Sequence, residues 1–90
     1  MGEQFLGNNP QDMQDLITKI NNAVNQIRDA MNQIEGKVNN VQWNGSDATR
    51  FKTVQWPESK TSLTTIISNL EGVAQLVTKQ KTEQEQTSAN

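Results

Sequence analysis

Apolar residues recur every three or four positions along most of the first half of this chain, and this pattern constrains the fold more than any other feature. From Met13 onward the spacings are 4, 3, 4, 3, 4, 3, 4 and 3. The positions are Met13, Ile17, Ile20, Val24, Ile27, Met31, Ile34, Val38 and Val41. A heptad repeat of this length places its apolar side chains on one face of an α-helix. The sequence therefore predicts a long amphipathic helix that packs against other helices.

The start of this helix is marked by Asn9-Pro10. Asn is a preferred N-cap residue, and Pro is favoured at the first helical position because its missing N–H has no helical partner there. We therefore predict a helix over residues 10–41, roughly 48 Å long at a rise of about 1.5 Å per residue. A helix of that length is too long to be covered by the rest of one 90-residue chain folded compactly.

The apolar face of the predicted helix is wider than a two-stranded coiled coil requires. Leu16, Ala23 and Ala30 each lie one position before a residue of the heptad seam. Such a broad face is typical of a helix that packs on more than one neighbour, as in a four-helix bundle. Leu, Ile, Val and Phe together number only nineteen of ninety residues, which is little apolar material for a stable monomer. The sequence therefore predicts an oligomer.

A second apolar pattern occupies the C-terminal half. Its seam consists of Leu63, Ile66, Leu70, Val73 and Val77, with Ile67, Ala74 and Leu76 beside it. Extended backward, this seam meets Trp56 but misses Phe51 and Val54. Pro57 removes a backbone donor and disfavours α geometry in the residue before it. We therefore expect a second helix with a kink or short break near Pro57.

Between the two patterns lies the segment Val41-Gln42-Trp43-Asn44-Gly45, whose composition suits a chain reversal. Asn and Gly tolerate positive φ, and Ser46 or Asp47 can cap the helix that follows. The predicted fold is therefore an all-α helix-turn-helix hairpin. Two interpretations of Trp43 stay open, and both can hold together. Trp43 can be a core residue that closes the hairpin, and it can be an aromatic that helps to form a surface cleft for a partner.

The ends of the chain are predicted to be less ordered than the hairpin. Residues 1–8 are expected to form a loose arm, with Phe5 and Leu6 able to pack on a neighbouring helix. From Gln80 onward the sequence is polar, so we expect a frayed helix, flexible from about residue 83 to residue 90. Residues 1–90 are predicted to form one domain.

The composition argues against several classes of function. The chain has no Cys and no His, so it lacks thiolate metal ligands, the commonest neutral metal ligand and the commonest general base. We therefore predict no catalytic site, no metal and no cofactor. The net charge of −2 gives no footprint for nucleic acid. The sequence also predicts no transmembrane segment and no N-terminal signal peptide.

The Trp43-Asn44-Gly45 turn, placed between two long amphipathic segments in a chain without Cys, resembles the WXG family of small type VII secretion substrates. Ala48, Phe51 and Trp56 are similar to the second-helix signature of that family, and residues 83–88 are similar to the endings of actinobacterial members. The resemblance covers nearly the whole chain.

The resemblance implies a hairpin that dimerises antiparallel into a four-helix bundle. It also implies export in the folded state by a bacterial machine driven by a membrane ATPase, without a signal peptide. On this basis the protein would be cytoplasmic before export and then extracellular or at the cell surface. It would act as a secreted substrate, an effector or an export partner. The partners implied are a second copy or a paralogous WXG-type chain, together with the secretion ATPase.

One feature of the family is missing. A Tyr-x-x-x-Asp/Glu export signal follows the second helix in at least one subunit of a family pair, and this chain has no Tyr. Its nearest equivalent runs from Lys79 to Glu83, which keeps the acid. In the family, the Trp-x-Gly turn of the other chain is thought to complete a two-part recognition surface. The chain is therefore either a homodimer with a diverged signal or the signal-less half of a heterodimer. An intracellular coiled-coil adaptor or phage structural bundle is the alternative hypothesis.

Overall fold

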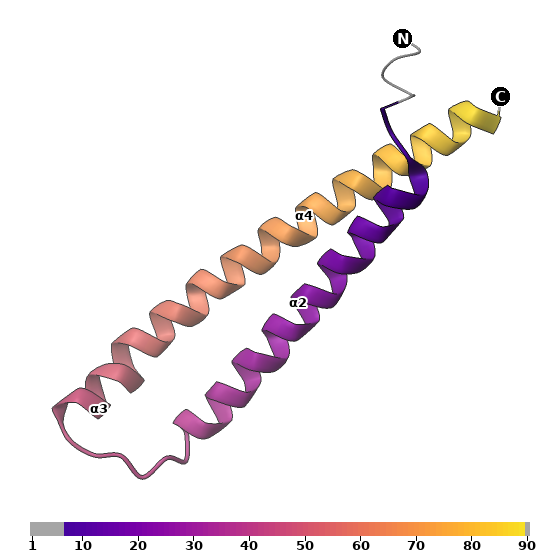
Figure 1. Cartoon of the computed structure of the whole chain (residues 1–90). Helices are drawn as coiled ribbons and strands as arrows, with labels where there is room; N and C mark the ends of the chain where they lie inside the picture. Colours follow the sequence, from indigo (N-terminus) through magenta and orange to yellow (C-terminus); the bar gives the residue numbers. More distant parts are fainter. Residues whose placement is uncertain (1–6, 90) are drawn as a thin grey trace.

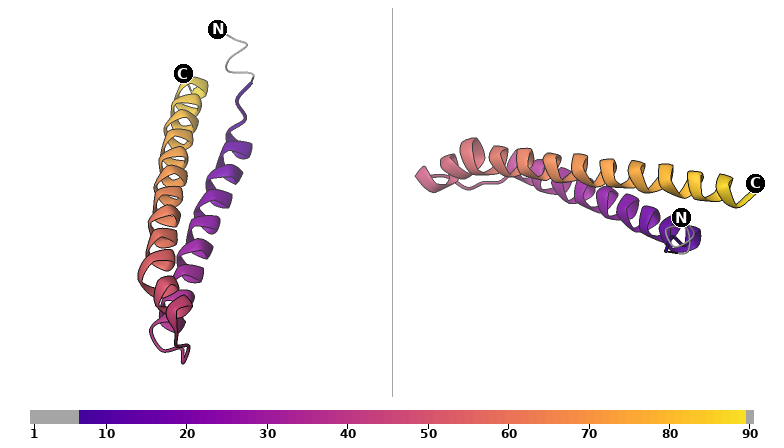
Figure 2. Two further views of the ribbon diagram at one scale, coloured as in Figure 1. Left: turned by 90° about the vertical axis from the view of Figure 1, so that its left-hand side faces the viewer. Right: turned by 90° about the horizontal axis from the view of Figure 1, so that it is seen from above.

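The computed structural model describes residues 7–89, with side chains as far as residue 86. This part of the chain folds into two long antiparallel helices, α2 (Pro10–Val38) and α4 (Trp56–Ala89), which lie side by side (Figures 1 and 2). A short helix α3 (Ser46–Arg50) and a π-helical turn η1 (Phe51–Gln55) lead directly into α4. No strand occurs among the described residues. The predicted all-α hairpin is confirmed.

Helix α2 begins where the sequence predicted. The Asn9 side chain accepts a hydrogen bond from the backbone N–H of Asp12 (3.0 Å), and Pro10 occupies the first helical position. The helix ends at Val38, however, three residues before the predicted end. Asn39 and Asn40 follow, and Asn side chains compete for backbone hydrogen bonds and so favour turns over helix interiors. The apolar repeat therefore continues past the end of the helix.

The second arm is helical without interruption from Ser46 to Ala89, so of the kink or short break expected near Pro57, the break is absent. The irregularity is instead η1, in which the backbone N–H of Trp56 bonds to the carbonyl of Phe51, five residues back. A π turn is wider than an α turn. We attribute it to Pro57, which has no N–H and whose ring would crowd the carbonyl four residues before it.

The π turn also explains the change of apolar phase in the second arm. A π turn adds one residue to a helical turn, so it rotates the residues before it relative to those after it. Phe51 and Val54 therefore do not continue the seam of α4. Trp56, the first residue of α4, does point toward α2 and is only 5 % exposed.

The hairpin core is narrow and lies between α2 and α4. Its buried members are Ile20, Val24, Ile67 and Ala74, with Ile27, Met31 and Leu70 packed against them. Ile17 is also buried, whereas Ile34 is 42 % exposed. On α2, the predicted seam therefore supplies the core along most of its length.

On α4 the predicted seam faces α2 only in part: Leu70 packs against the core, but two other seam residues are exposed. Ile66 and Val73 are each 45 % exposed, whereas their neighbours Ile67 and Ala74 are buried. The residues of the two sets are all apolar, and each exposed residue is next to a buried one. Periodicity along α4 therefore does not indicate which set faces α2. Packing against α2 fixes the rotation of α4 about its own axis. In this orientation Ile66 and Val73 face away from the hairpin core.

Helix α4 also extends past Gln80, where the sequence predicted fraying, and ends at Ala89. Gln84 is buried, at 8 % exposure, and Lys81 pairs with Glu85 across one helical turn (3.2 Å). Lys, Glu and Gln are good helix formers, which explains why a polar tail stays helical. The flexibility expected for residues 83–90 remains a prediction, and the contact expected from Phe5 and Leu6 lies outside the described residues.

Candidate functional site

The connection between α2 and α3 depends on a glycine. Gly45 has φ 115° and ψ 175°, a conformation that residues with a Cβ rarely adopt. Gly45 occupies the N-cap position of α3, and its carbonyl accepts from the backbone N–H of Thr49 (3.0 Å). No side chain caps α3, so the cap expected from Ser46 or Asp47 is wrong. The chain turns into α3 through the backbone conformation of Gly45, without a capping side chain.

Trp43 is not a core residue of the hairpin. Its side chain is 43 % exposed, and its ring contacts that of Phe51 in a tilted arrangement with centroids 5.8 Å apart. The Lys52 ammonium donates to the Trp43 carbonyl (3.2 Å). These contacts hold the segment that carries Trp43 against η1 while leaving part of the indole on the surface. Of the two interpretations of Trp43, the structure supports the surface one.

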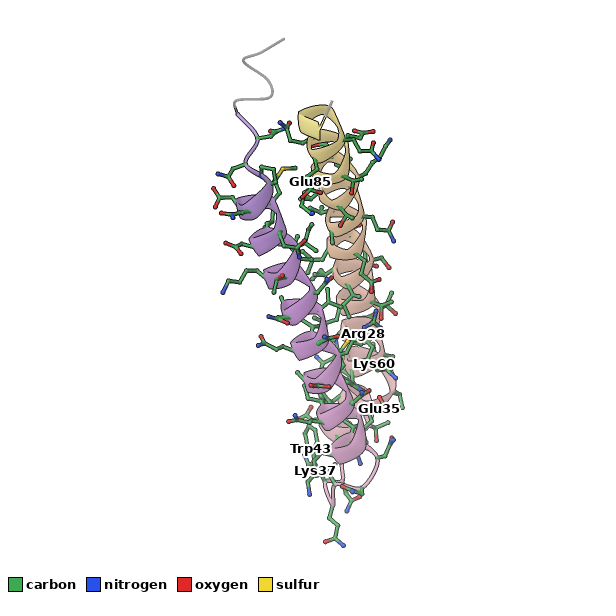
Figure 3. All side chains as sticks on the ribbon, turned by 90° about the vertical axis from the view of Figure 1, so that its right-hand side faces the viewer. Arg28, Glu35, Lys37, Trp43, Lys60 and Glu85 are labelled. Atoms are coloured by element: carbon green, nitrogen blue, oxygen red, sulfur yellow. The ribbon has the colours of Figure 1, made fainter. Side chains whose placement is uncertain are left out.

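The exposed indole forms one side of an apolar cleft of about 330 Å³, which we call the Trp43 groove. It is lined by Gln33, Ile34, Lys37, Val38, Val41, Trp43 and Phe51. Trp43 and Lys37 lie together at the turn end of the hairpin (Figure 3). Lys37 is the one lining residue with a charge. The groove therefore combines apolar walls with a cationic side chain.

Beside the Trp43 groove, Glu35 links the end of α2 to the start of α4. One oxygen of its carboxylate accepts from the Trp56 indole N–H (2.7 Å) and pairs with the Lys60 ammonium (2.9 Å). The other accepts from the Asn39 amide (3.3 Å). The ion pair with Lys60, and then the hydrogen bond from Trp56, lower the pKa of Glu35. Figure 3 shows Glu35 and Lys60 close together near the turn.

This linkage was missed in the sequence, although one signal for it exists. A Trp that meets an apolar seam is expected to be buried, and a buried indole N–H needs an acceptor. The sequence indicated that Trp56 lies on the seam. It did not indicate which of the acidic side chains on α2 would face it, because that depends on how the helices are aligned.

The candidate tail signal lies far from the turn within one chain. Lys79 and Glu83 are both exposed, one helical turn apart on α4. They belong to the C-terminal part of α4, at the open end of the hairpin, whereas the linker of residues 39–45, which carries Trp43, lies at the closed end (Figure 1). A single hairpin therefore does not bring the two parts of the expected recognition surface together.

Two kinds of site are not found in the part of the chain that the structure describes. Residues 7–89 contain no group of three or more acidic, His or Cys side chains placed to hold a metal ion. Within the same range, neither long helix carries an apolar stretch sufficient to cross a bilayer.

A protein-family model described as WXG100, proteins of 100 residues with WXG, matches residues 8–88. The match includes α2, the Trp43-Asn44-Gly45 turn and all of α4 except its last residue. No curated protein and no solved structure matches the chain.

Proposed function

The chain belongs to the WXG100 family of type VII secretion substrates, and from this premise we propose that it is exported by a type VII system as a folded dimer of hairpins. It acts as a secreted substrate, effector or export partner, and it does no catalysis of its own. The protein is cytoplasmic until export and then extracellular or at the cell surface.

The observation that carries this proposal is the exposed indole of Trp43. A Trp needed only for folding buries most of its ring, as Trp56 does at 5 % exposure. Trp43 instead is 43 % exposed and lines an apolar groove. Exposed aromatic side chains in apolar clefts are common anchors of protein interfaces. The Trp43 groove is therefore the surface we assign to recognition by the secretion ATPase or by a chain exported with this protein.

The dimer is supported by apolar side chains that the hairpin leaves uncovered. On α2 these are Leu16 and Ile34, and on α4 they are Ile66, Val73 and Leu76, with exposed fractions of 42–53 %. Two helices bury only the stripes that face each other, so a second apolar stripe on each needs another pair of helices. Two hairpins packed as a four-helix bundle cover these stripes. The partner is a second copy or a paralogous WXG-type chain.

An antiparallel dimer also accounts for the separation between the turn and the tail. When two hairpins pack in opposite directions, the open end of each lies beside the closed end of the other. Lys79 and Glu83 of one chain then approach the Trp43 groove of its partner. We propose that these two residues are a diverged export signal, completed by Trp43, Asn44 and Gly45 of the other subunit.

Trp43→Ala tests the proposal. In the source organism we expect it to lower ATPase-dependent accumulation in the culture supernatant by about tenfold or more, since truncating an aromatic hot-spot residue costs an interface about 2 kcal/mol or more. The matched control is Val54→Ala, because Val54 is also 43 % exposed but does not line the groove. The control should be exported like the wild type.

The same experiment separates the two functional hypotheses. Wild-type protein found only in the cell pellet, in equal amounts with and without the secretion ATPase, would contradict export. That outcome would favour an intracellular coiled-coil adaptor or phage structural bundle.

A further inference from the structure

The Trp43 groove is built from two walls that belong to different parts of the chain. Ile34 and Val38 lie on the last turns of α2, whereas Trp43 and Phe51 lie on the linker and on η1. The linker from residue 39 to residue 45 joins the walls but contains no helix. The shape of the groove therefore depends on what holds the end of α2 against the start of the second arm.

Glu35 makes that connection. It follows Ile34 directly and precedes Val38 by less than one helical turn, so it moves with the first wall. Its carboxylate receives the Trp56 indole N–H at 2.7 Å and the Lys60 ammonium at 2.9 Å. Trp56 is the residue whose backbone N–H closes the π turn on Phe51. Glu35 is thus tied to the base of the second wall.

The hydrogen bond from Trp56 restricts geometry more than the ion pair does. The Trp56 side chain is only 5 % exposed, and a buried indole N–H left without an acceptor costs free energy, so the ring is held where Glu35 meets it. The side chains of Lys60 and Glu35 are 38 % and 39 % exposed, and ion pairs at that exposure add little stability. The main effect of Glu35 is therefore orientation.

We propose that Glu35 is a positioning residue for the Trp43 groove: through Trp56 it fixes η1, and with it Phe51 and Trp43, against the end of α2. The consequence for export rests on the function proposed above. The effect of Glu35 on the shape of the Trp43 groove does not depend on that function.

The structural test compares two acidic residues that link the same pair of helices. Glu35 pairs with Lys60, and Glu71 pairs with Arg28 (2.8 Å) away from the groove. The chain has two Trp residues, so the indole N–H signals of Trp43 and Trp56 can be followed in proton–nitrogen NMR spectra of the full-length protein. Glu35→Ala should shift the indole N–H signals of Trp56 and Trp43 and the backbone amide signal of Phe51. Glu71→Ala should leave all three signals unchanged.

Two further variants separate positioning from general loss of stability. Glu35→Gln keeps an acceptor for the Trp56 N–H, so its Trp43 signal should stay close to that of the wild type. Trp56→Phe keeps an aromatic ring but removes the donor, so it should shift the Phe51 and Trp43 signals as Glu35→Ala does. If Glu35→Ala or Trp56→Phe leaves the Trp43 and Phe51 signals in place, or if Glu71→Ala moves them equally, the proposal is wrong.

The export test uses the same variants. Glu35→Ala should lower the secreted fraction by about three- to tenfold relative to Glu71→Ala, the change expected when one orienting hydrogen bond is lost. Glu35→Gln should retain most export. Wild-type protein that is not exported would overturn the proposed function, while the NMR comparison would still decide the role of Glu35. Equal export of Glu35→Ala and Glu71→Ala would overturn the consequence for export.

Discussion

At the scale of single residues, the turn end of the hairpin depends on a few side chains with different chemical roles. Gly45 supplies a backbone conformation, Trp56 supplies a buried donor, and Glu35 supplies the acceptor for it. Trp43, two residues before Gly45, is left partly exposed. The residues that shape the site are therefore distinct from the residue that presents its surface.

Replacing Gly45 with Ala should destabilise the protein by about 1–3 kcal/mol, the usual cost of a strained backbone conformation. Apart from Gly45 and its two neighbours in the chain, no residue has an atom within 4 Å of the added Cβ, so the cost comes from the backbone conformation at φ 115°. Gly36→Ala is the matched control. Gly36 is inside α2 and its added Cβ also meets nothing within 4 Å, so this change should stabilise by about 0.5–1 kcal/mol. Urea unfolding measures both, and an equal effect of the two substitutions would contradict the prediction.

The contribution of Glu35 to stability should depend on pH. Its pKa is lowered from 4.5, first by Lys60 and then by Trp56. A carboxyl group whose pKa is lower in the folded state stabilises the fold above its unfolded pKa, and this contribution is lost as the pH falls through the folded pKa. The Tm of the wild type should therefore exceed that of Glu35→Gln at neutral pH. The difference should shrink as the pH falls below about 4.5. A difference that persists in strong acid would contradict this account.

At the scale of secondary-structure elements, α2 and α4 bury their stripes unequally. The seam of α2 enters the core as its heptads predict, whereas α4 turns Ile67 and Ala74 inward and Ile66 and Val73 outward. The π turn in η1 allows this orientation of α4 while Phe51 contacts Trp43 in the linker. In the second arm, α4 therefore contributes to the hairpin core, whereas η1 contributes to the Trp43 groove.

Ile67→Ala should lower the free energy of unfolding by about 2–4 kcal/mol, because it removes a side chain that is only 3 % exposed and leaves a cavity. Val54→Ala, at a site that is 43 % exposed, should change it by less than about 0.5 kcal/mol. Thermal or urea unfolding followed by circular dichroism at one fixed protein concentration compares the two. If both substitutions lowered the free energy of unfolding by a similar amount, α4 would have to present a different face to α2.

At the scale of the whole molecule, the single chain is elongated, with extents of 66 × 18 × 14 Å. Such a shape offers little interior, and several apolar side chains of both long helices stay about half exposed. This agrees with the small amount of apolar sequence available for a core. A second hairpin is the simplest way to cover these side chains.

We therefore expect sedimentation at micromolar protein concentration to show a folded dimer. Ile66→Glu should weaken dimerisation at least about tenfold, because it places an unpaired charge in the interface. The control is Thr65→Glu, which adds the same charge at the exposed position one residue earlier and should leave the dimer intact. A stable folded monomer of the wild type would contradict the prediction, as would equal effects of the two variants.

The sequence by itself determined that the chain forms two long helices joined by a reversal. The heptad repeat located α2, Asn9-Pro10 located its start, and the Trp43-Asn44-Gly45 segment located the reversal, because helix periodicity, capping and turn conformations depend on residues that are neighbours in the chain. The tertiary structure alone decided which face of α4 packs on α2, that Trp43 is exposed, and that Glu35 accepts a hydrogen bond from Trp56. The contact between Glu35 and Trp56 joins residues 21 positions apart, so it depends on how packing aligns the two long helices. The exposure of Trp43 depends on how the linker packs on η1. The Trp43 groove is therefore a property of the folded hairpin, although its central residues could be identified in the sequence.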